Sequence, residues 1–509
     1  MRKDWKHLLL LLALMGPLIF PLVRPGFFLS DDGEWMVIRL AAFHQSLRAG
    51  QFPVRFLETL NHGYGYPVPD FLYPLPFYAG EFFHLLRFSF SDSVKILFLL
   101  SMVLSAVTMY ELAKKEWGRW PGVAAAVFYV WAPYRIFDIY SRGSLGESFA
   151  FIFPPLVFLF LIRAFETKQM KFSSLAALSY AALICSHNTI AFLFTPVIFL
   201  FIVLKIFQSK FSKEHIVNSL LFGLLSLSAS SWFWFPAIYD LRFTKMAAIT
   251  VADFNNYFVD GQNWFSLIGP GMLLIILTST VLIGIRKEWK MLFLLGTALF
   301  GLFLTTSFSG VFWQTGIFPK LVQFPWRFLS VAVFAVGLLL AYLLHGGKQP
   351  IMALAAIFLM VVVSWPVLKV NPVVRDESFY LTNDDTTTVK GEYMPKWITE
   401  NPQNRPPEKI EILSGEGSAF SNDRLSMKTA GKVRINTVFF PGIKVYLDNK
   451  ETGFYYKDGG LPTLLVSAGQ HTLETKFTET WWRLAADLVS LVGLSLSMLL
   501  IFIKRLWRS

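Results

Sequence analysis

Long apolar segments recur along this chain, and most of them end at a lysine, an arginine or a short polar loop. They lie roughly at residues 8–23, 94–112, 121–136, 148–163, 173–186, 189–207, 217–236, 266–285, 291–306, 327–344, 350–368 and 483–503. About twenty apolar residues are enough for a helix to cross the bilayer. The pattern therefore predicts an α-helical polytopic membrane protein with about twelve spans.

The segment 369–482 has a different pattern. It is polar, and apolar side chains alternate with polar ones in stretches such as 443–448. Alternation with a period of two, bounded by turn residues such as those at 459–460, is typical of antiparallel strands. We therefore expect three parts: a transmembrane module of eleven spans at 1–368 with a long first outer loop at 24–93, a small extracytoplasmic β-sandwich-like domain at 369–482, and a last span with a basic tail at 483–509.

Composition and charge agree with a membrane location. The 509 residues are 54% hydrophobic, 16% are charged and the mean hydropathy is +0.50. The net charge of +12 comes from short basic clusters between the apolar segments, which is the positive-inside pattern rather than a nucleic-acid-binding surface. It predicts a multi-pass cell-membrane protein with both termini in the cytoplasm and no nucleic-acid partner. The single cysteine, Cys185, lies in an apolar segment, so we expect no disulfide and no cysteine metal site.

An acidic pair, Asp31 and Asp32, follows the first apolar segment. Ionised carboxylates are costly inside hydrocarbon, so the pair belongs at the wet rim of the bilayer. A helical pattern with an apolar face begins at Trp35 and predicts an amphipathic helix in the membrane interface. Asp31 and Glu34 have the spacing of a capping box, so the aspartates could simply cap this helix. The same position also suits a general base or a metal ligand.

Two arginines and a glutamate lie on the predicted outer face. Arg142 and Glu147 belong to a short Ser- and Gly-containing loop, 137–147, where a helix begins. An arginine at such a place can bind a phosphate, and the alternative is a simple Arg–Glu ion pair. Arg327 comes just before the tenth span, at the height of a lipid phosphate. The alternative for Arg327 is a side chain that only extends to the interface.

Aromatic and polar residues of two other outer loops are candidates for a substrate cleft. His62, Tyr64 and Tyr66 lie in a loop dense in aromatic residues, glycine and proline, which suits either a sugar-binding cleft or a plain aromatic belt. His187 and Asn188 interrupt an apolar stretch at the outer face. A polar residue at that depth is a functional candidate, although a single histidine is more often a packing residue.

Together these strings resemble the GT-C superfamily of polytopic membrane glycosyltransferases, near the protein O-mannosyltransferase and aminoarabinose-transferase type. The resemblance covers essentially the whole chain. The motifs and segments that carry it are Asp31-Asp32, the helix from Trp35, residues 63–67, 142–147, 323–328 and 391–395, and the β-domain before the last span. The chain departs from the family pattern at Asp70, where an uncharged residue is expected.

The resemblance implies an inverting transfer of a sugar from a polyprenyl-phosphate donor, among membrane lipids, to an envelope glycan, lipid or protein acceptor on the outer face. It implies that Asp31 or Asp32 is the base, that Glu147 assists the base or orients the acceptor, and that Arg142 and Arg327 bind the leaving phosphate. Some family members need a divalent cation such as Mg²⁺ or Mn²⁺, and Asp31 and Asp32 would then be its ligands. The competing hypothesis is a transporter, flippase or assembly factor for lipid-linked saccharides without catalysis.

Overall fold

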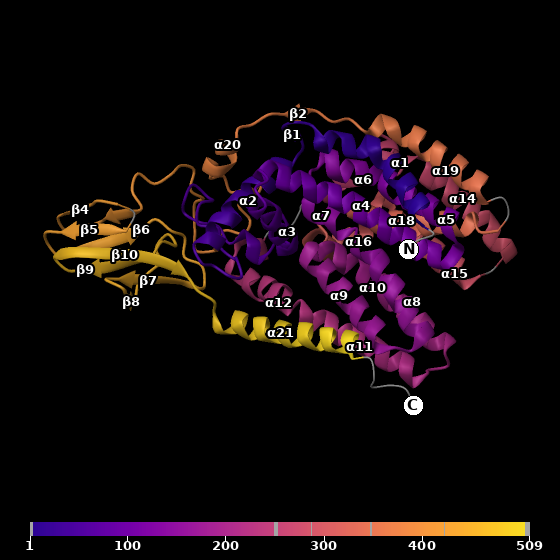
Figure 1. Ribbon diagram of the computed structural model, residues 1–509. Helices are drawn as coiled ribbons and strands as arrows, with labels where there is room; N and C mark the ends of the chain where they lie inside the picture. Colours follow the sequence, from indigo (N-terminus) through magenta and orange to yellow (C-terminus); the bar gives the residue numbers. More distant parts are fainter. Residues whose placement is uncertain (1–3, 249–252, 287, 347–348, 422, 504–509) are drawn as a thin grey trace.

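The computed structural model describes residues 4–248, 253–286, 288–346, 349–421 and 423–503, and most of them are helical (Figure 1). The helices are α1 Trp5–Val23, α2 Gly33–Arg48, α3 Pro74–Leu85, α4 Phe90–Trp117, α5 Arg119–Trp131, α6 Pro133–Ile136, α7 Leu145–Ala150, α8 Phe153–Thr167, α9 Met170–Ser186, α10 Asn188–Gln208, α11 Lys213–Ala229, α12 Ser231–Asp240, α13 Trp264–Leu267, α14 Gly269–Arg286, α15 Trp289–Thr305, α16 Gly310–Gln314, α17 Ile317–Leu321, α18 Leu329–Leu343, α19 Gln349–Ser364, α20 Glu377–Thr382 and α21 Trp481–Phe502.

The predicted fold class is confirmed, but the number of full-length spans is lower than expected. Seven helices of the described residues are long and apolar enough to cross a membrane, or up to nine if each of two bent helix pairs is one span. The bends, of 66° and 85°, follow α11 and α15. Two further apolar helices are shorter than a full span. The predicted basic tail after Ile503 lies outside the described residues.

The β-domain consists of two small antiparallel sheets that share an apolar core. Its strands are β3 Ile410–Ile412, β4 Gly417–Ala419, β5 Arg424–Met427, β6 Gly431–Ile435, β7 Ile443–Leu447, β8 Lys450–Thr452, β9 Thr463–Val466 and β10 Gly469–Phe477. The order is β4-β5-β10-β7-β8 in one sheet and β3-β6-β9 in the other. Val433, Val445 and Leu473 are among the residues buried between the two sheets. Successive side chains of a strand point to opposite faces, so their neighbours in sequence face outward and are polar.

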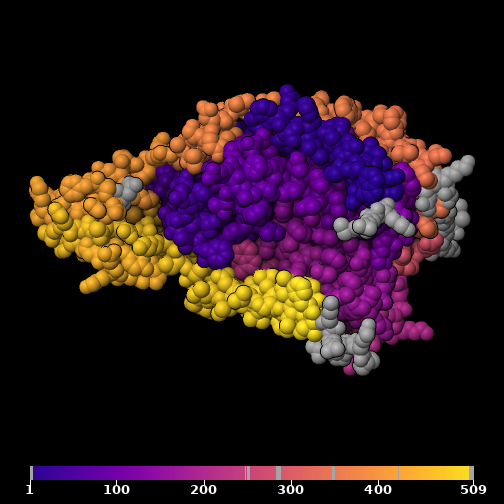
Figure 2. Space-filling model, viewed as in Figure 1, coloured from indigo at the N-terminus to yellow at the C-terminus, as the bar shows by residue number. Residues whose placement is uncertain are grey.

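The segment 369–409 is not part of these sheets. It runs as a strap from the end of α19 over the first outer loop to the β-domain (Figures 1 and 2). The strap begins with β2 (Pro372–Val373), which pairs antiparallel with β1 (Phe27–Phe28). Farther along, Thr387 receives a hydrogen bond of 2.9 Å from Nε of Arg39 on α2. The strap therefore covers α2, which is mostly buried instead of lying open in the membrane interface.

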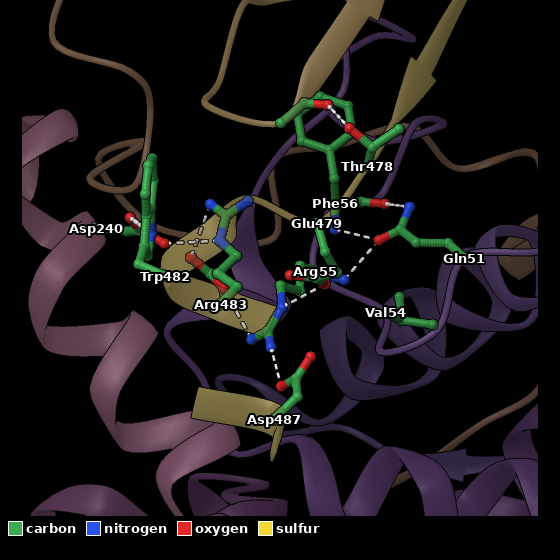
Figure 3. A network of polar contacts seen from close by, with 12 residues as sticks. Gln51, Val54, Arg55, Phe56, Asp240, Thr478, Glu479, Trp482, Arg483 and Asp487 are labelled. Carbon is green, nitrogen blue, oxygen red and sulfur yellow. Dashed lines mark hydrogen bonds and ion pairs between the residues drawn. The ribbon is translucent and has the colours of Figure 1, made fainter. Parts of the chain in front are cut away.

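A buried ionic network, here called the latch, joins the first outer loop to the start of α21 (Figure 3). Arg55 donates hydrogen bonds to Glu479, Asp70 and Asp487 at 2.7, 3.2 and 3.0 Å. Arg483 lies beside it, with contacts to Asp240 of α12 at 2.8 Å and to Asp70 at 3.5 Å.

The members of the latch are Arg55, Asp70, Asp240, Glu479, Arg483 and Asp487. Asp70, the residue that departs from the GT-C pattern, lies between the two arginines and is fully buried. It is one of the four carboxylates that pair with the two arginines, and unpaired charges buried here would be costly.

Candidate active site

The two aspartates are fixed in place by their backbone. The N–H of Asp31 donates to the carbonyl of Ser141 at 2.9 Å, and the N–H of Asp32 donates to the carbonyl of Arg142 at 2.8 Å. Gly143 allows this approach. A Cβ on Gly143, whose φ is +66°, would lie 2.5 Å from the backbone nitrogen of Gly33 and from Ser30 Oγ. The Arg142 loop thus lies this close to the acidic turn because Gly143 has no side chain.

Neither aspartate caps α2 through its side chain. Asp32 is the N-cap residue but makes no capping bond, and Ser30 Oγ accepts the N–H of Gly33 at 3.2 Å instead. Glu34 is not part of a capping box, since it contacts Arg375 at 3.2 Å. Among the described residues, no side chain forms a hydrogen bond or ion pair with Asp31 or Asp32. The capping interpretation of the sequence is therefore not supported, and both carboxylates are available to a ligand.

The surroundings of Asp31 raise its pKa. Partial burial, together with the neighbouring Asp32 carboxylate, raises the pKa of Asp31 above its usual value, and the Arg142 guanidinium opposes this rise. A carboxylate with a raised pKa is a stronger base than an ordinary one. Asp31 is the more exposed of the two aspartates.

Arg142 is held by two buried carboxylates. Its Nη1 donates to Asp138 at 3.0 Å and to Glu147 at 2.9 Å. Asp138 belongs to a π-helical turn, Phe137–Ser141, which precedes Arg142. Such turns are rare and are frequent at functional sites. Glu147 also accepts the hydroxyl of Tyr134. The Arg–Glu ion pair considered from the sequence is present, but it is buried rather than a surface pair.

Arg327 approaches the same cluster from the start of α18. Its Nε lies 3.6 Å from Glu147 and forms no hydrogen bond among the described residues, while its Nη1 donates to the Val322 carbonyl and to Gln323, both at 2.8 Å. Arg327 is buried, so it does not extend along the interface as the alternative from the sequence supposed.

Positive charge is in excess in this cluster. Three buried arginines face two buried carboxylates in the set Arg135, Arg142, Arg327, Asp138 and Glu147. An excess of buried positive charge next to open carboxylates is suited to an anionic ligand, because a bound phosphate would compensate it.

His187 lines the site as a neutral residue. Its ring stacks on Tyr73 with centroids 5.4 Å apart, and its Nδ1 accepts the N–H of Ile190 at the start of α10. Burial, with Arg327 nearby, lowers the pKa of His187 to about 3. Asn188 is exposed, and its side chain accepts the N–H of Thr189 at 2.9 Å. His187 thus packs against Tyr73, the kind of role that the sequence favoured for it, and it also caps the start of α10.

The other candidate cleft residues lie at the seam with the β-domain and the strap. Tyr66 is fully buried; its hydroxyl contacts Thr388 at 2.8 Å and accepts the N–H of Tyr393 at 3.0 Å. His62 contacts Asp384 of the strap at 3.2 Å, and the carbonyl of Tyr64 accepts the N–H of Val438. These three residues hold the strap and the β-domain to the predicted first outer loop.

The residues near Asp31 do not by themselves form a closed metal site. Among the described residues, no group of three His, Cys, Asp or Glu side chains is arranged to hold a metal ion. Magnesium, however, is commonly bound by one or two carboxylates, with waters and substrate phosphates as its other ligands. The open carboxylates of Asp31 and Asp32 fit that requirement.

Sequence comparison places the chain in a family. The sequence model of the 6-pyruvoyl-tetrahydropterin synthase related domain, described as a membrane protein, matches residues 70–373. The chain belongs to this family. The part matched to the family includes Arg142, Glu147 and Arg327 and begins after Asp31-Asp32. An uncharacterised protein of Lactococcus lactis subsp. cremoris (strain MG1363) is 22% identical over 248 residues, which make up 47% of this chain and 40% of the relative.

Two solved structures are similar to this family member. The arabinofuranosyltransferase AftD from Mycobacteria has a TM-score of 0.50 at 15% identity, over 72% of this chain and 27% of AftD. The apo oligosaccharyltransferase of Archaeoglobus fulgidus has a TM-score of 0.47 at 14% identity, over 73% of this chain and 57% of the other. The chain thus spans less than two thirds of the length of these proteins. The likeness to AftD shows a shared fold, and this agrees with the fold that the GT-C resemblance implies.

Proposed function

We propose that this chain is an integral-membrane glycosyltransferase. It moves a sugar, with inversion, from a polyprenyl-phosphate donor to an acceptor on the extracytoplasmic face. The observation that carries this proposal is the contact between the two loops: Asp31 and Asp32, whose carboxylates are open, are hydrogen-bonded through their backbone to the loop that holds the buried Arg142. A base and a phosphate-binding cation are the two groups that such a transfer needs. The GT-C fold supports the same reaction class by analogy.

In the proposed reaction, the Asp31 carboxylate removes the proton from the acceptor hydroxyl or amine. The acceptor atom then forms a bond to the anomeric carbon from the side opposite the phosphate. The bond between the anomeric carbon and the phosphate oxygen breaks, and the polyprenyl phosphate leaves with the electron pair. Arg142 and Arg327 compensate the charge that grows on this phosphate.

In this proposal Glu147 is a positioning residue, because both of its carboxylate oxygens already accept hydrogen bonds from protein side chains. One oxygen accepts the Arg142 guanidinium at 2.9 Å and the other accepts the Tyr134 hydroxyl. Glu147 therefore fixes the orientation of Arg142 and keeps its own charge balanced. A divalent cation at Asp31 and Asp32 would supply further charge stabilisation to the donor phosphate.

The test is a transfer assay on the purified full-length protein with a panel of radiolabelled polyprenyl-phosphate sugars and envelope glycan, lipid and peptide acceptors. Asp31→Asn is compared with the wild type. We expect turnover to fall by a factor on the order of 10²–10⁴, the usual contribution of a general base. The melting temperature should not fall, since the Asp31 carboxylate forms no hydrogen bond or ion pair among the described residues. Asp376→Asn, an exposed outer aspartate on the strap, is the matched control and should keep wild-type turnover.

The same assay separates the enzyme from the non-catalytic alternative. Saturable donor binding without turnover, equal in wild type and Asp31→Asn, would reject the glycosyltransferase and favour a transporter or assembly factor. Turnover that is lost in Asp32→Asn but retained in Asp31→Asn would assign the base to the other aspartate.

A further inference from the structure

A second cavity lies at the opposite end of the helix bundle from Asp31. The acidic turn follows the end of α1, whereas this cavity is lined by the end of α4, which lies beside the start of α1: Lys114 and Arg119 both contact Asp4 there. The cavity is open at its mouth and lies between α4, α8, α10, α15 and α18. By the charge pattern of the loops, this is the predicted cytoplasmic end.

The walls of the cavity are apolar and aromatic, and its mouth is charged. The wall includes Phe158, Phe201, Phe293, Leu294 and Phe334. The charged lining residues lie at the other end of the cavity, at helix termini: Glu116, Glu166, Lys205 and Lys290. An apolar pocket under a charged rim suits an amphiphile, with its apolar part inside and its head group at the rim.

The charges at the mouth are not balanced. Glu116 contacts Lys115 and Lys290 at 3.2 and 2.6 Å, and Glu166 contacts Lys115 at 2.6 Å. Lys205 is different. Among the described residues, no carboxylate lies within ion-pair distance of its Nζ, which rests on the ring of Trp289 at 4.7 Å.

Lys205 is therefore the extra cation of the mouth, because each neighbouring carboxylate already has a lysine partner. Lys290 and Lys115 repel the ammonium group. Glu116 and Glu166 attract it from beyond ion-pair distance, so three lysines face two carboxylates here. An anion at this point would satisfy the ammonium group of Lys205 without breaking the ion pairs around it.

We propose that this cavity binds an anionic phospholipid of the adjacent leaflet. One acyl chain lies between α8, α10 and α15, and the phosphate contacts the ammonium group of Lys205. Anionic lipids are attracted to basic clusters at the cytoplasmic surface, and an aromatic side chain such as Trp289 is common at head-group depth. The site is separate from the proposed transfer site and does not depend on it.

The experiment is native mass spectrometry of the full-length protein after removal of bound lipid. Dioleoyl phosphatidylglycerol is titrated back, with dioleoyl phosphatidylcholine and undecaprenyl phosphate as separate arms. We expect one phosphatidylglycerol to bind with higher affinity than phosphatidylcholine. Lys205→Gln should weaken this binding on the order of tenfold, as for loss of a charge-assisted hydrogen bond. Lys213→Gln, an exposed lysine at the same end of the bundle, is the matched control and should bind as the wild type does.

A second variant tests the cavity itself. Leu294→Phe reduces the space for the chain while leaving Lys205 in place, and it should also weaken phosphatidylglycerol binding. Equal binding of the two phospholipids, or equal effects of Lys205→Gln and Lys213→Gln, would overturn the proposal. Binding of undecaprenyl phosphate alone would show that the occupant is a prenyl lipid instead.

Discussion

The raised pKa of Asp31 predicts how the transfer rate depends on pH. A base must be ionised, so the rate falls as the pH drops through its pKa. Burial and the Asp32 carboxylate raise the pKa of Asp31. The acid limb of kcat/KM should therefore lie above the usual aspartate value of 3.8. Asp32→Asn removes the neighbouring charge and should move this limb to lower pH. An unchanged acid limb in Asp32→Asn, measured on its residual activity, would contradict the assignment of Asp31 as base.

Gly143 tests whether the contact between the two loops is needed. Gly143→Ala places a methyl group 2.5 Å from the Gly33 nitrogen and from Ser30 Oγ, at a φ of +66°. We expect a loss of about 1–3 kcal/mol in stability from this overlap and a fall in transfer activity. Thermal unfolding and the transfer assay measure the two effects. Gly63→Ala is the control, because Gly63 has a φ of +79° and a Cβ there would have no described neighbour within 4 Å. Equal effects of the two substitutions would show that backbone strain alone is responsible.

At the site, the sequence locates the charged residues but not the contacts that hold them. Asp31, Asp32, Arg142, Glu147 and Arg327 are all predicted on one face. Tyr134 is missed because it lies in the stretch 121–136, which has the pattern of a plain span. Asp138 is missed although it lies in the predicted outer loop 137–147, because the sequence pattern points only to Arg142 and Glu147 of that loop as a pair. The spacing of Asp138 and Arg142, four residues apart, is a signal for an ion pair on one side of a helical turn.

At the scale of elements, the apolar pattern predicts helices well and their breaks less well. The first and last spans coincide closely with α1 and α21. The segment 121–136 is divided, since α5 ends at Trp131 and Pro133 begins α6. Proline disfavours a helical conformation in the residue before it, which explains the break. The helical pattern of α2 is visible in the sequence, but its burial is not, because the strap that covers it comes from more than 300 residues farther along the chain.

The latch predicts a large loss of stability when one of its arginines is removed. Arg483→Met leaves Asp240 and Asp70 buried with fewer positive partners, and breaking a buried pair in this way costs about 3–5 kcal/mol. We expect a clear fall in the melting temperature in detergent. In Arg483→Met combined with Asp240→Asn, part of the loss should be recovered, because one unpaired charge is removed.

Arg434→Gln is the matched control for the latch. Arg434 forms a partly exposed pair with Glu411 in the β-domain, and surface pairs of this kind contribute about 0–1 kcal/mol. If Arg434→Gln lowers the melting temperature as much as Arg483→Met does, the latch contributes no more to stability than a surface ion pair.

At the scale of the molecule, the strap, the latch and the contacts of Tyr66 and His62 hold the predicted first outer loop, the helical bundle and the β-domain together. Figure 2 shows α21 lying along the body of the helical bundle, and the β-domain projects beyond it. Arg55 and Glu479 are 424 positions apart in the sequence. Hydrophobic periodicity is a local signal. It therefore predicts the helical bundle and the β-domain, but it does not predict the pairing of Arg55 with Glu479. The contacts of Tyr66 and His62 with the strap give another reason for the aromatic residues of the first loop. The sequence suggested a substrate cleft there, and the structure packs these side chains against the strap.

The orientation of the whole molecule can be tested because it has a single cysteine, Cys185, which is buried. In a Cys185→Ala background, Lys457→Cys places an exposed thiol on the β-domain, and Lys213→Cys places one at the start of α11. The positive-inside pattern predicts that a membrane-impermeant maleimide labels Lys457→Cys in intact cells and labels Lys213→Cys only after lysis. Both thiols are exposed, so a difference between them reports sidedness rather than burial, and labelling after lysis is the control for reactivity. Labelling of Lys213→Cys in intact cells would reverse the topology, and it would place Asp31 and the proposed transfer site on the cytoplasmic side.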